Sequence, residues 1–556
     1  MEITPSYRSS RSRSRSRTRN STANSRATSA TRRPSISSAK RSLSSSSLDR
    51  LTVTPTRIDS ERSIPSVQVV LDNSLPKDFF KQDIIALAKI LKISKWHKRN
   101  LLQQHLAITR ISGALTNSIY KIEYNDDESD VHLPALLLRV YGKNVDELID
   151  RDSELQILIK LSQKRIGPRL LGIFTNGRFE QFLDGFVTLN KEQIRNEVIS
   201  QMIGRRMKDL HYKIELNMDD FQSAPTCWRL IEKWLKILEF EYMPQYEAAG
   251  INPKDVFFFN FQEFKKLVFK YKHWLFSKYD EAKEEFASNY KFCHNDTQYG
   301  NLLLRESFKP EHIIIGDNPN FSASNFNDVA IRSTSNKKDS DLVVIDFEYS
   351  GPNFPAFDIV NHFSEWMANY HDPVRSYYID QDKYPTKLQQ LNLIKSYIEY
   401  DFQFPSSNLK TSKSPIELSD NPKSQAINLI QHEIEKFYNE CVYWRGSVQI
   451  YWCLWGLIQN GSLKPTLQVE STGEKGVDST YNITVDIEKL SVDDSEVATQ
   501  EAITSCDDDF DYLKYSNQKI AIFMGDAIQF KLIDENEIDQ EYRKSIKYLS
   551  IDTFDY

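Results

Sequence analysis

Residues 290–305 read YKFCHNDTQYGNLLLR, and this stretch decides the fold that we expect. It places Asn301 five residues after Asp296, and a second, apolar stretch over 342–346 ends in Asp346. Phosphoryl transfer needs one carboxylate that accepts the proton of a substrate hydroxyl. It also needs a second carboxylate and an amide oxygen that hold Mg²⁺ against the phosphates of ATP. Asp296, Asn301 and Asp346 are side chains of these types.

Residues upstream match the other parts of such a site. A turn that contains Gly113 and Asn117 can cover phosphates with its backbone N–H groups. Arg139 is a lone charge in an apolar strand, and Glu154 on the next helix can pair with it. Each feature alone is more often structural, since a glycine turn is commonly only a turn. Their order along the chain, however, predicts a protein-kinase-like fold.

The hydrophobic pattern predicts an α+β chain with two lobes behind a disordered N-terminal tail. A small, β-rich N-terminal lobe over residues 74–183 precedes a large helical C-terminal lobe over residues 184–556. In the small lobe we expect helices over 78–91 and 146–163, two strands within 108–124, and further strands over 135–141, 170–174 and 178–183. Three polar, weakly periodic stretches are expected to be loop insertions: 307–340, 405–424 and 461–509.

The tail, residues 1–66, is strongly basic at its start. Residues 1–50 hold 12 Lys and Arg, two acidic residues and 17 Ser, so their net charge is +10 and the rest of the chain carries −16. Too few apolar side chains are present to offset the entropy lost on ordering. Three interpretations are open: a mitochondrial transit peptide, a segment that binds nucleic acid or anionic membrane, and a solvated regulatory tail. Ser35, which follows two arginines and a proline, is a candidate substrate of a regulatory protein kinase.

Composition also bears on partners and location. No apolar run approaches the roughly 20 residues that span a bilayer, and we expect neither a transmembrane segment nor a secretory signal. The five cysteines lack metal-binding spacing, which favours reduced thiols and a cytoplasmic location. The acidic body has no RNA-binding signature, so no nucleic acid is expected as a partner. A protein that works through tail-driven binding is the distant alternative to an enzyme.

Five stretches together resemble the signature of the choline/ethanolamine kinase family, most closely that of its fungal choline kinases: 138–142, 177–182, 294–301, 344–349 and 357–366. The resemblance covers about residues 74–550. It implies an ATP- and Mg²⁺-dependent choline kinase that makes phosphocholine and ADP, the first step of phosphatidylcholine synthesis through CDP-choline. An ethanolamine kinase, or an enzyme that accepts both amines, is the alternative. A homodimer formed through the smaller lobe is common in the family.

The resemblance also assigns roles to individual residues. Asp296 corresponds to the catalytic base, with Gln298 beside it, and Asn301 and Asp346 correspond to the Mg²⁺ ligands. His294 is expected to steady the loop and not to transfer a proton. The ATP-binding set that the resemblance implies is Gly113, Asn117, Arg139, Glu154, Glu180 and Gln181. The last two fall in the linker between the lobes, where adenine would bond to backbone groups.

Recognition of choline imposes a physical requirement on its site. A quaternary ammonium has no N–H to donate, so it must be held by the faces of aromatic rings and a nearby anion. Trp452 and Trp455 are three residues apart on an apolar helix and therefore share a face. An aromatic stripe of this kind is more often part of a core. With the family resemblance, we expect Tyr370, Trp452, Trp455 and Tyr515 to surround the amine, with Glu365 as the anion.

Overall fold

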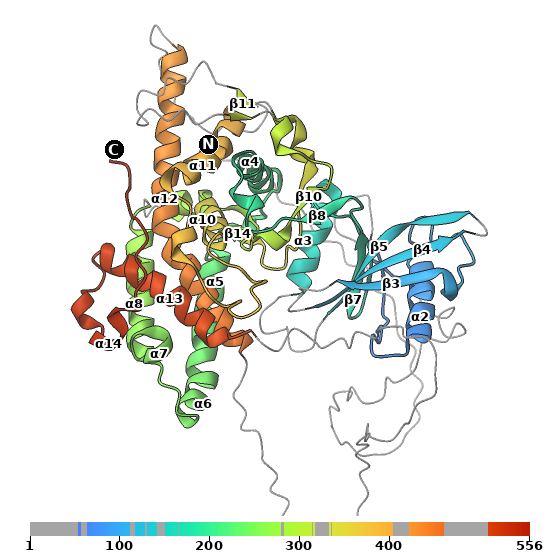
Figure 1. Cartoon of the computed structure of the whole chain (residues 1–556), viewed down its shortest axis with the longest axis horizontal. Coiled ribbons are helices and arrows are strands. Elements are labelled where there is room, and N and C mark those ends of the chain that lie inside the picture. The colour runs from blue at the N-terminus through green and yellow to red at the C-terminus, as the bar shows by residue number, and fades with distance from the viewer. Residues whose placement is uncertain are drawn as a thin grey trace, which may run out of the picture.

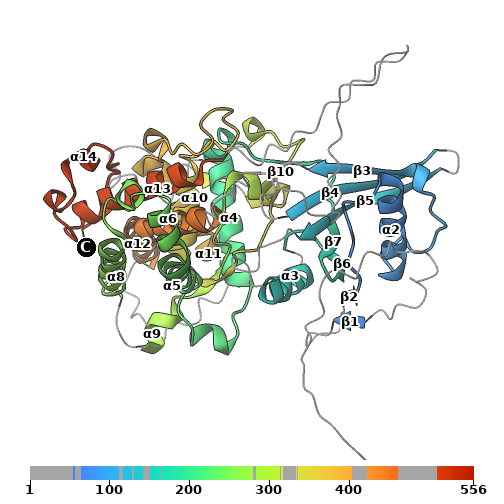
Figure 2. The same cartoon turned by 90° about the horizontal axis from the view of Figure 1, so that it is seen from below.

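The computed structural model has a β-rich part and a larger helical part (Figure 1). Figure 2 shows the same division from below, with the strands of the large sheet on one side and most helices on the other. The structure describes residues 54–56, 64–111, 117–127, 130–141, 151–164, 166–279, 283–313, 315–316, 333–334, 336–403, 422–460 and 510–555. The predicted insertion over 461–509 and the turn around Gly113 lie outside these residues, as do the side chains of Asn117 and Glu154.

A seven-stranded sheet with the order β1-β2-β6-β7-β5-β4-β3 forms the N-terminal lobe. Its strands are β1 Thr54–Thr56, β2 Ile64–Val67, β3 Leu106–Ile111, β4 Asn117–Asp126, β5 Val131–Tyr141, β6 Leu170–Phe174 and β7 Gly177–Gln181. The first described strand, β1, thus lies inside the stretch predicted as tail. β1 and β2 are short and contain proline, so the hydrophobic pattern of the sequence did not predict them as strands. They are strands because β2 pairs in parallel with β6 and β1 pairs with β2.

Alternation along β5 separates the core of this lobe from the face that bears the charged groups. Leu136, Leu138 and Val140 are buried in the hydrophobic core beside helix α2 (Lys77–Ile90), and the intervening Arg139 points to the other face of the sheet. β7 comes very close to this point, because a Cβ on Gly177 would lie 2.2 Å from the Arg139 carbonyl oxygen. Only glycine fits there, at the start of the strand that pairs with β6 as an antiparallel hairpin.

The C-terminal lobe is built mainly from helices. The long ones are α4 Glu197–Lys213, α5 Thr226–Ile237, α8 Phe261–Phe276, α10 Pro355–Glu365, α11 Lys387–Gln403, α12 Pro422–Gln459 and α13 Tyr512–Gln529. The short ones are α6 Met243–Ala248, α7 Lys254–Phe257, α9 Lys283–Ser288 and α14 Gln540–Arg543, while α3 Arg151–Lys164 lies against β6 of the sheet. Residues 441–442 and 444–458 of α12 are all buried, and this stretch runs through one continuous apolar core with α5, α8, α10 and α13.

The stretch over 441–458 is therefore mainly apolar on every side because other helices surround it. None of the helices in the described part of the chain combines the length and hydrophobicity needed to cross a membrane. Some helices begin with a side-chain cap: the Asn196 side chain accepts hydrogen bonds from the N–H groups of Val198 and Ile199 at the start of α4. Asp511 likewise accepts a bond from the N–H of Lys514 at the start of α13.

The motif over residues 290–305 lies on short strands of the C-terminal lobe. β8 (Phe186–Thr188), β10 (Leu302–Arg305) and β13 (Leu342–Val344) form one small sheet, and β9 (Lys291–Cys293) pairs with β14 (Gly351–Asn353). The predicted insertion over 307–340 is described in part and includes the short pair β11 (Ile315–Gly316) and β12 (Ser333–Thr334). The insertion predicted over 405–424 lies outside the described residues except for 422–424, which begin α12.

Candidate active site

The predicted metal ligands meet at one edge of the small sheet. β10 and β13 run antiparallel, so the residue before β10 and the residues after β13 lie at the same end. Asn301 immediately precedes β10, and Asp346 follows β13 by two residues. The N–H of Ile345 donates a 2.9 Å hydrogen bond to the carbonyl of Asn301, which ties the two segments together. The pairing thus brings together an amide and a carboxylate that are 45 residues apart in the chain.

Asn301 is oriented by the predicted catalytic base. Its amide nitrogen donates to both the backbone carbonyl and the carboxylate Oδ2 of Asp296, each at 2.9 Å. Because these bonds fix the nitrogen side of the amide, the oxygen remains for a cation. Carboxylate and amide oxygens are the ligands that Mg²⁺ prefers, so Asn301 and Asp346 fit the metal that the sequence predicts.

Two residues of this site have left-handed backbone conformations. Asn295 has φ 65° and Asp346 has φ 63°, values that cost free energy for residues other than glycine. Asn295 is held in place by its side chain, which donates to the carbonyl of Tyr349 at 2.9 Å and accepts from Asn353 at 2.7 Å.

The carboxyl of Asp296 holds its proton unusually well. Burial raises its pKa well above the ordinary value, and the neighbouring carboxylates of Glu365, Asp346 and Glu348 raise it further. A higher pKa makes a carboxylate a stronger base, which suits a group that must take a proton from an alcohol. The Asn301 bond opposes the shift, as a donor to the charged form should.

Arg139 reaches across from β5 to Asp346, the predicted metal ligand. Its Nη1 donates to Asp346 Oδ1 at 2.9 Å, and its Nε lies 4.0 Å from Glu180 Oε1. Burial alone would raise the pKa of Asp346, but the adjacent guanidinium overcomes this and lowers it. The predicted pairing of Arg139 with Glu154 stays a prediction, because that side chain is outside the described residues. The described partner, Asp346, lies 207 residues away in sequence and was not predicted.

Glu180, Gln181 and Gln298 all have local partners in the structure. Glu180 accepts a 2.5 Å bond from Arg178, so it belongs to the buried charge cluster beside Arg139. The N–H of Gln181 is donated to the carbonyl of Arg169, and an adenine bond at this residue would therefore use another group. Gln298 Oε1 accepts from the N–H of Gly300 and caps the short turn that ends at Asn301. Their predicted roles with ATP or in catalysis stay predictions.

The predicted amine-binding residues gather beside the catalytic loop. The rings of Trp452 and Trp455 lie 5.3 Å apart, and Tyr515 lies 6.3 Å from Trp455. The Tyr370 hydroxyl donates to Glu365 Oε2 at 2.7 Å. The structure thus brings this aromatic–acidic cluster (Glu365, Tyr370, Trp452, Trp455 and Tyr515) together from α10, α12, α13 and the segment after α10.

Each tryptophan of the aromatic–acidic cluster is tied to Asn295 through one intermediate residue. Trp452 Nε1 donates to Asn361 Oδ1 at 2.7 Å, and the Asn361 amide donates to the carbonyl of Asn295. Trp455 Nε1 donates to the Tyr349 hydroxyl at 2.7 Å, and the Tyr349 carbonyl accepts from Asn295. The position of the cluster relative to Asp296 is therefore fixed by hydrogen bonds and by packing.

Further rings line the same region but were outside the predicted set. Phe510 lies 5.4 Å from the ring of Tyr515 and 4.8 Å from that of Tyr512. The Tyr299 hydroxyl accepts from the N–H of Tyr370, and the two rings are 6.0 Å apart. Tyr299 follows Asp296 by three residues, so its place in the motif was the signal that could have found it.

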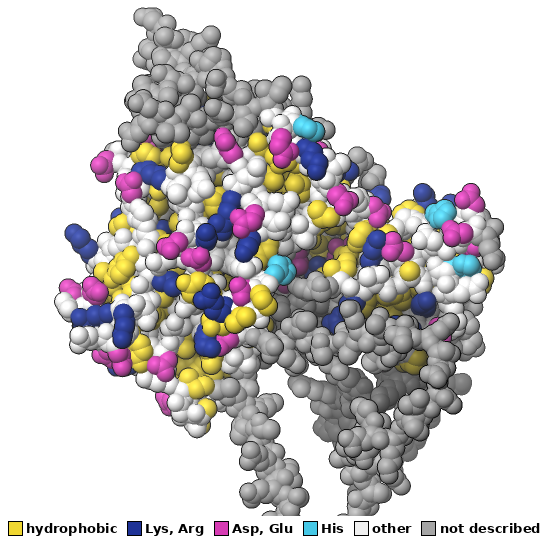
Figure 3. All heavy atoms as spheres, in the orientation of Figure 1, with side chains coloured by type: hydrophobic (Ala, Val, Ile, Leu, Met, Phe, Trp, Pro, Cys, Tyr) yellow, Lys and Arg dark blue, Asp and Glu magenta, His cyan; other side chains and the backbone are white. Residues whose placement is uncertain are grey.

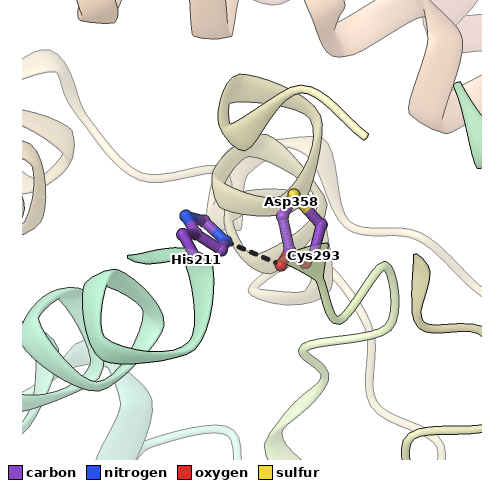
Figure 4. Close-up of side chains that lie close together, drawn as sticks. All are labelled: His211, Cys293 and Asp358. Carbon is purple, nitrogen blue, oxygen red and sulfur yellow. Dashed lines mark hydrogen bonds and ion pairs between the residues drawn. The ribbon is translucent and has the colours of Figure 1, made fainter. Parts of the chain in front are cut away.

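Behind the loop, a buried carboxylate holds its backbone. Asp358 of α10 accepts from the N–H groups of His294 and Asn295 at 2.7 and 2.9 Å, and from the Thr297 hydroxyl at 2.8 Å. Its fourth donor is His211 Nε2 of α4 at 3.0 Å (Figure 4). Asp358 thus holds the loop in place from α10. The only site residue predicted on that helix was Glu365, for the amine site.

The same carboxylate belongs to a cluster with metal-ligand chemistry. His211, Cys293 and Asp358 present ligand atoms within 4.8 Å of one another, and all three are buried (Figure 4). The hydrogen bonds of Asp358 already use both of its oxygens. The other nitrogen of His211 lies 2.8 Å from the Tyr397 hydroxyl, and burial raises the pKa of the Cys293 thiol, which keeps it protonated. These contacts make the cluster a structural brace.

His294 steadies the loop, as predicted. Its Nε2 lies 2.8 Å from the carbonyl of Ile345, its Nδ1 accepts from the N–H of Asp296, and its side chain is fully buried. Burial lowers the pKa of His294, so the ring is neutral and joins the loop to the segment that carries Asp346.

Comparison with known proteins places the site in a family context. The model of the choline/ethanolamine kinase family matches residues 108–524, and that of the choline kinase N terminus matches residues 55–103. A choline kinase of Saccharomyces cerevisiae is 37% identical over 498 residues, which cover 85% of this chain and 80% of the relative. An ethanolamine kinase of the same yeast is 31% identical and covers 84% of this chain and 80% of the relative.

The fold is shared with a solved structure at lower identity. The crystal structure of a choline kinase from Cryptosporidium parvum aligns with a TM-score of 0.52 at 18% identity. The alignment covers 82% of this chain and 97% of the other. At that level of identity the likeness concerns the fold, and it confirms the two-lobed architecture expected from the sequence.

Proposed function

This chain belongs to the choline/ethanolamine kinase family, and from that premise we propose that it transfers the γ-phosphate of ATP to the hydroxyl of choline. The products are phosphocholine and ADP. One observation carries the proposal: the two tryptophans of the aromatic–acidic cluster are linked, each through one intermediate residue, to Asn295, the neighbour of Asp296 in the chain. A bound cation would then have its hydroxyl arm next to a buried base, as direct in-line transfer requires.

Each described residue has one task in this reaction. Asp296 orients the alcohol and accepts its proton. Asn301 and Asp346 would hold Mg²⁺, which when bound supplies positive charge to the phosphates of ATP. Arg139, already beside Asp346, supports the same phosphate charge from the small lobe. No phosphoenzyme forms, because the nucleophile is the substrate oxygen.

Choline is favoured over ethanolamine by the make-up of the amine site. Four aromatic side chains gather there with one carboxylate, and ring faces attract a trimethylammonium group that cannot donate hydrogen bonds. Ethanolamine is the second candidate, supported by the ethanolamine kinase similarity and by Glu365, whose carboxylate could accept from a primary ammonium.

A coupled ADP-release assay with both amines tests the proposal. The full chain should turn over choline with a higher kcat/KM than ethanolamine, and omission of the divalent cation should abolish turnover. A matched variant, Asp296→Asn, supplies the background rate. If the full chain released ADP with neither amine above that background, the proposed function would be wrong.

Further proposals concern location and partners. The four described cysteines are free and buried, which supports a cytoplasmic, reducing environment. On the face shown in Figure 3, basic and acidic side chains are interspersed, which supports the expectation that no nucleic acid binds this part of the chain. A homodimer and a regulatory kinase that acts near Ser35 also stay proposals. Deletion of residues 1–53 should leave choline turnover intact, whereas a tail-driven binding protein would lose its partner.

A further inference from the structure

A buried lysine stands behind the anion of the amine site. Lys519 of α13 has a side chain with no solvent exposure, and its Nζ lies 3.5 Å from Glu365 Oε1. The other oxygen of Glu365 accepts the 2.7 Å bond from Tyr370. Each carboxylate oxygen of Glu365 therefore already faces a cation or a donor.

Lys519 is poorly compensated for a charge so deeply buried. Its ammonium carries three N–H donors, and none of them meets an acceptor among the described residues with ordinary hydrogen-bond geometry. The groups around it are Glu365 on α10, Asp296 on the loop, the Tyr515 ring at 5.2 Å and Lys547 near the C-terminus. Burial lowers the pKa of Lys519, and Glu365 opposes that shift. One ion pair at 3.5 Å offsets only part of the free energy that is lost when an ammonium leaves water. An apolar side chain of similar length would be expected to stabilise the fold at least as well.

The position of this charge matters for which ammonium can bind. Ethanolamine carries three N–H donors and gains most from a carboxylate whose oxygens are open to accept. Choline carries none and gains from negative charge and ring faces alone. With Lys519 at Oε1 and Tyr370 at Oε2, Glu365 keeps its charge but has few directions left for new hydrogen bonds.

We propose that Lys519 is a specificity-determining residue, which engages Glu365 Oε1 and so biases the amine site toward quaternary over primary ammonium substrates. It acts through Glu365 and is a positioning residue. The inference rests on the proposed function and deepens it, because it names the residue that sets the choice between the two amines.

The test is the ratio of kcat/KM for ethanolamine to that for choline in Lys519→Met. Methionine has a similar length and no charge, so it frees Oε1. One new charge-assisted hydrogen bond to the substrate should raise the ratio about tenfold, which corresponds to about 1.4 kcal/mol. The control is Lys519→Arg, which keeps a cation beside Glu365 and should leave the ratio near that of the unchanged chain. A purely structural lysine would lower Tm or slow both substrates equally, and an unmoved ratio would overturn the inference.

A second variant decides the matter if Lys519→Met fails to fold. Tyr370→Phe frees the other oxygen, Oε2, and should raise the same ratio; if it leaves the ratio unchanged, the inference fails. Turnover by the unchanged chain is measured first with both amines. If it phosphorylates neither, the proposed function fails and the inference falls with it. If it phosphorylates either amine and the variants do not shift the ratio, only the inference is wrong.

Discussion

Replacing Asp358 with asparagine measures how strongly the buried brace supports the catalytic loop. The carboxylate accepts four hydrogen bonds of 2.7–3.0 Å, two at each oxygen. Asparagine keeps one oxygen and turns an NH2 group toward the two donors that the other oxygen served. Loss of two bonds to a charged acceptor costs about 3–6 kcal/mol, a large part of the roughly 5–15 kcal/mol that stabilises a typical domain.

The same substitution should impair turnover of the protein that remains folded. Two of the lost or altered bonds hold the backbone of His294 and Asn295, directly before Asp296. A displacement of about 1 Å at the base is enough to reduce the rate by about 100-fold. We therefore expect kcat for choline to fall by about that factor at a temperature where the variant is folded, with a coupled assay for kcat and a thermal melt for Tm.

Asp526→Asn is the matched control. Asp526 is also fully buried and forms an ion pair with Arg445 of α12, with none of its described bonds reaching the loop. It should lower Tm by a comparable amount while kcat of the folded protein stays near that of the unchanged chain. If both variants lost stability but had equal kcat values, Asp358 would not position the loop, and the reasoning would be refuted.

Three further outcomes are expected. Asp296→Asn should lower kcat by about 10³-fold, within the range for loss of a general base, with an unchanged Tm; a smaller loss in a steady-state assay would argue against its role. Trp455→Ala should raise KM for choline about tenfold through loss of one cation–π face, while Trp455→Phe should lose less; equal KM values in initial-rate measurements would contradict the aromatic site. Burial lowers the pKa of His362 to about 4, below its ordinary value near 6.5 in the unfolded chain. The folded state therefore binds fewer protons between these values, and about 3 kcal/mol of stability should be lost as the pH falls from 6.5 to 4. Urea unfolding at several pH values measures this slope, which should flatten in His362→Gln.

Short-range sequence signals predicted the core of the site. An apolar strand that ends in Asp346 and a motif with Asn301 five residues after Asp296 are both local patterns, and the antiparallel pairing of β10 and β13 brings them to one edge. Most helices and strands of the small lobe followed from hydrophobic periodicity in the same way, although β5 begins at Val131 and not at residue 135. The strands β1 and β2 were not predicted, because they are short and depend on pairing with β6.

Contacts between single side chains on distant helices could not be predicted. Periodicity indicates that Lys519 and His211 are on helices, and it says nothing about which carboxylate each will meet. The bond between Arg139 and Asp346 joins residues that no local pattern relates. In each case a polar residue on an apolar face is the only signal, and its partner is fixed by how the helices and the sheet pack together.

Direct detection of the product tests the central claim most plainly. ³¹P nuclear magnetic resonance of the full chain with ATP, a divalent cation and choline should show a phosphocholine resonance that grows as the γ-phosphate signal of ATP declines, and that grows about 10³-fold more slowly in Asp296→Asn. Loss of ATP accompanied only by inorganic phosphate, or a phosphocholine signal that grows as fast in Asp296→Asn as in the unchanged chain, would contradict the account.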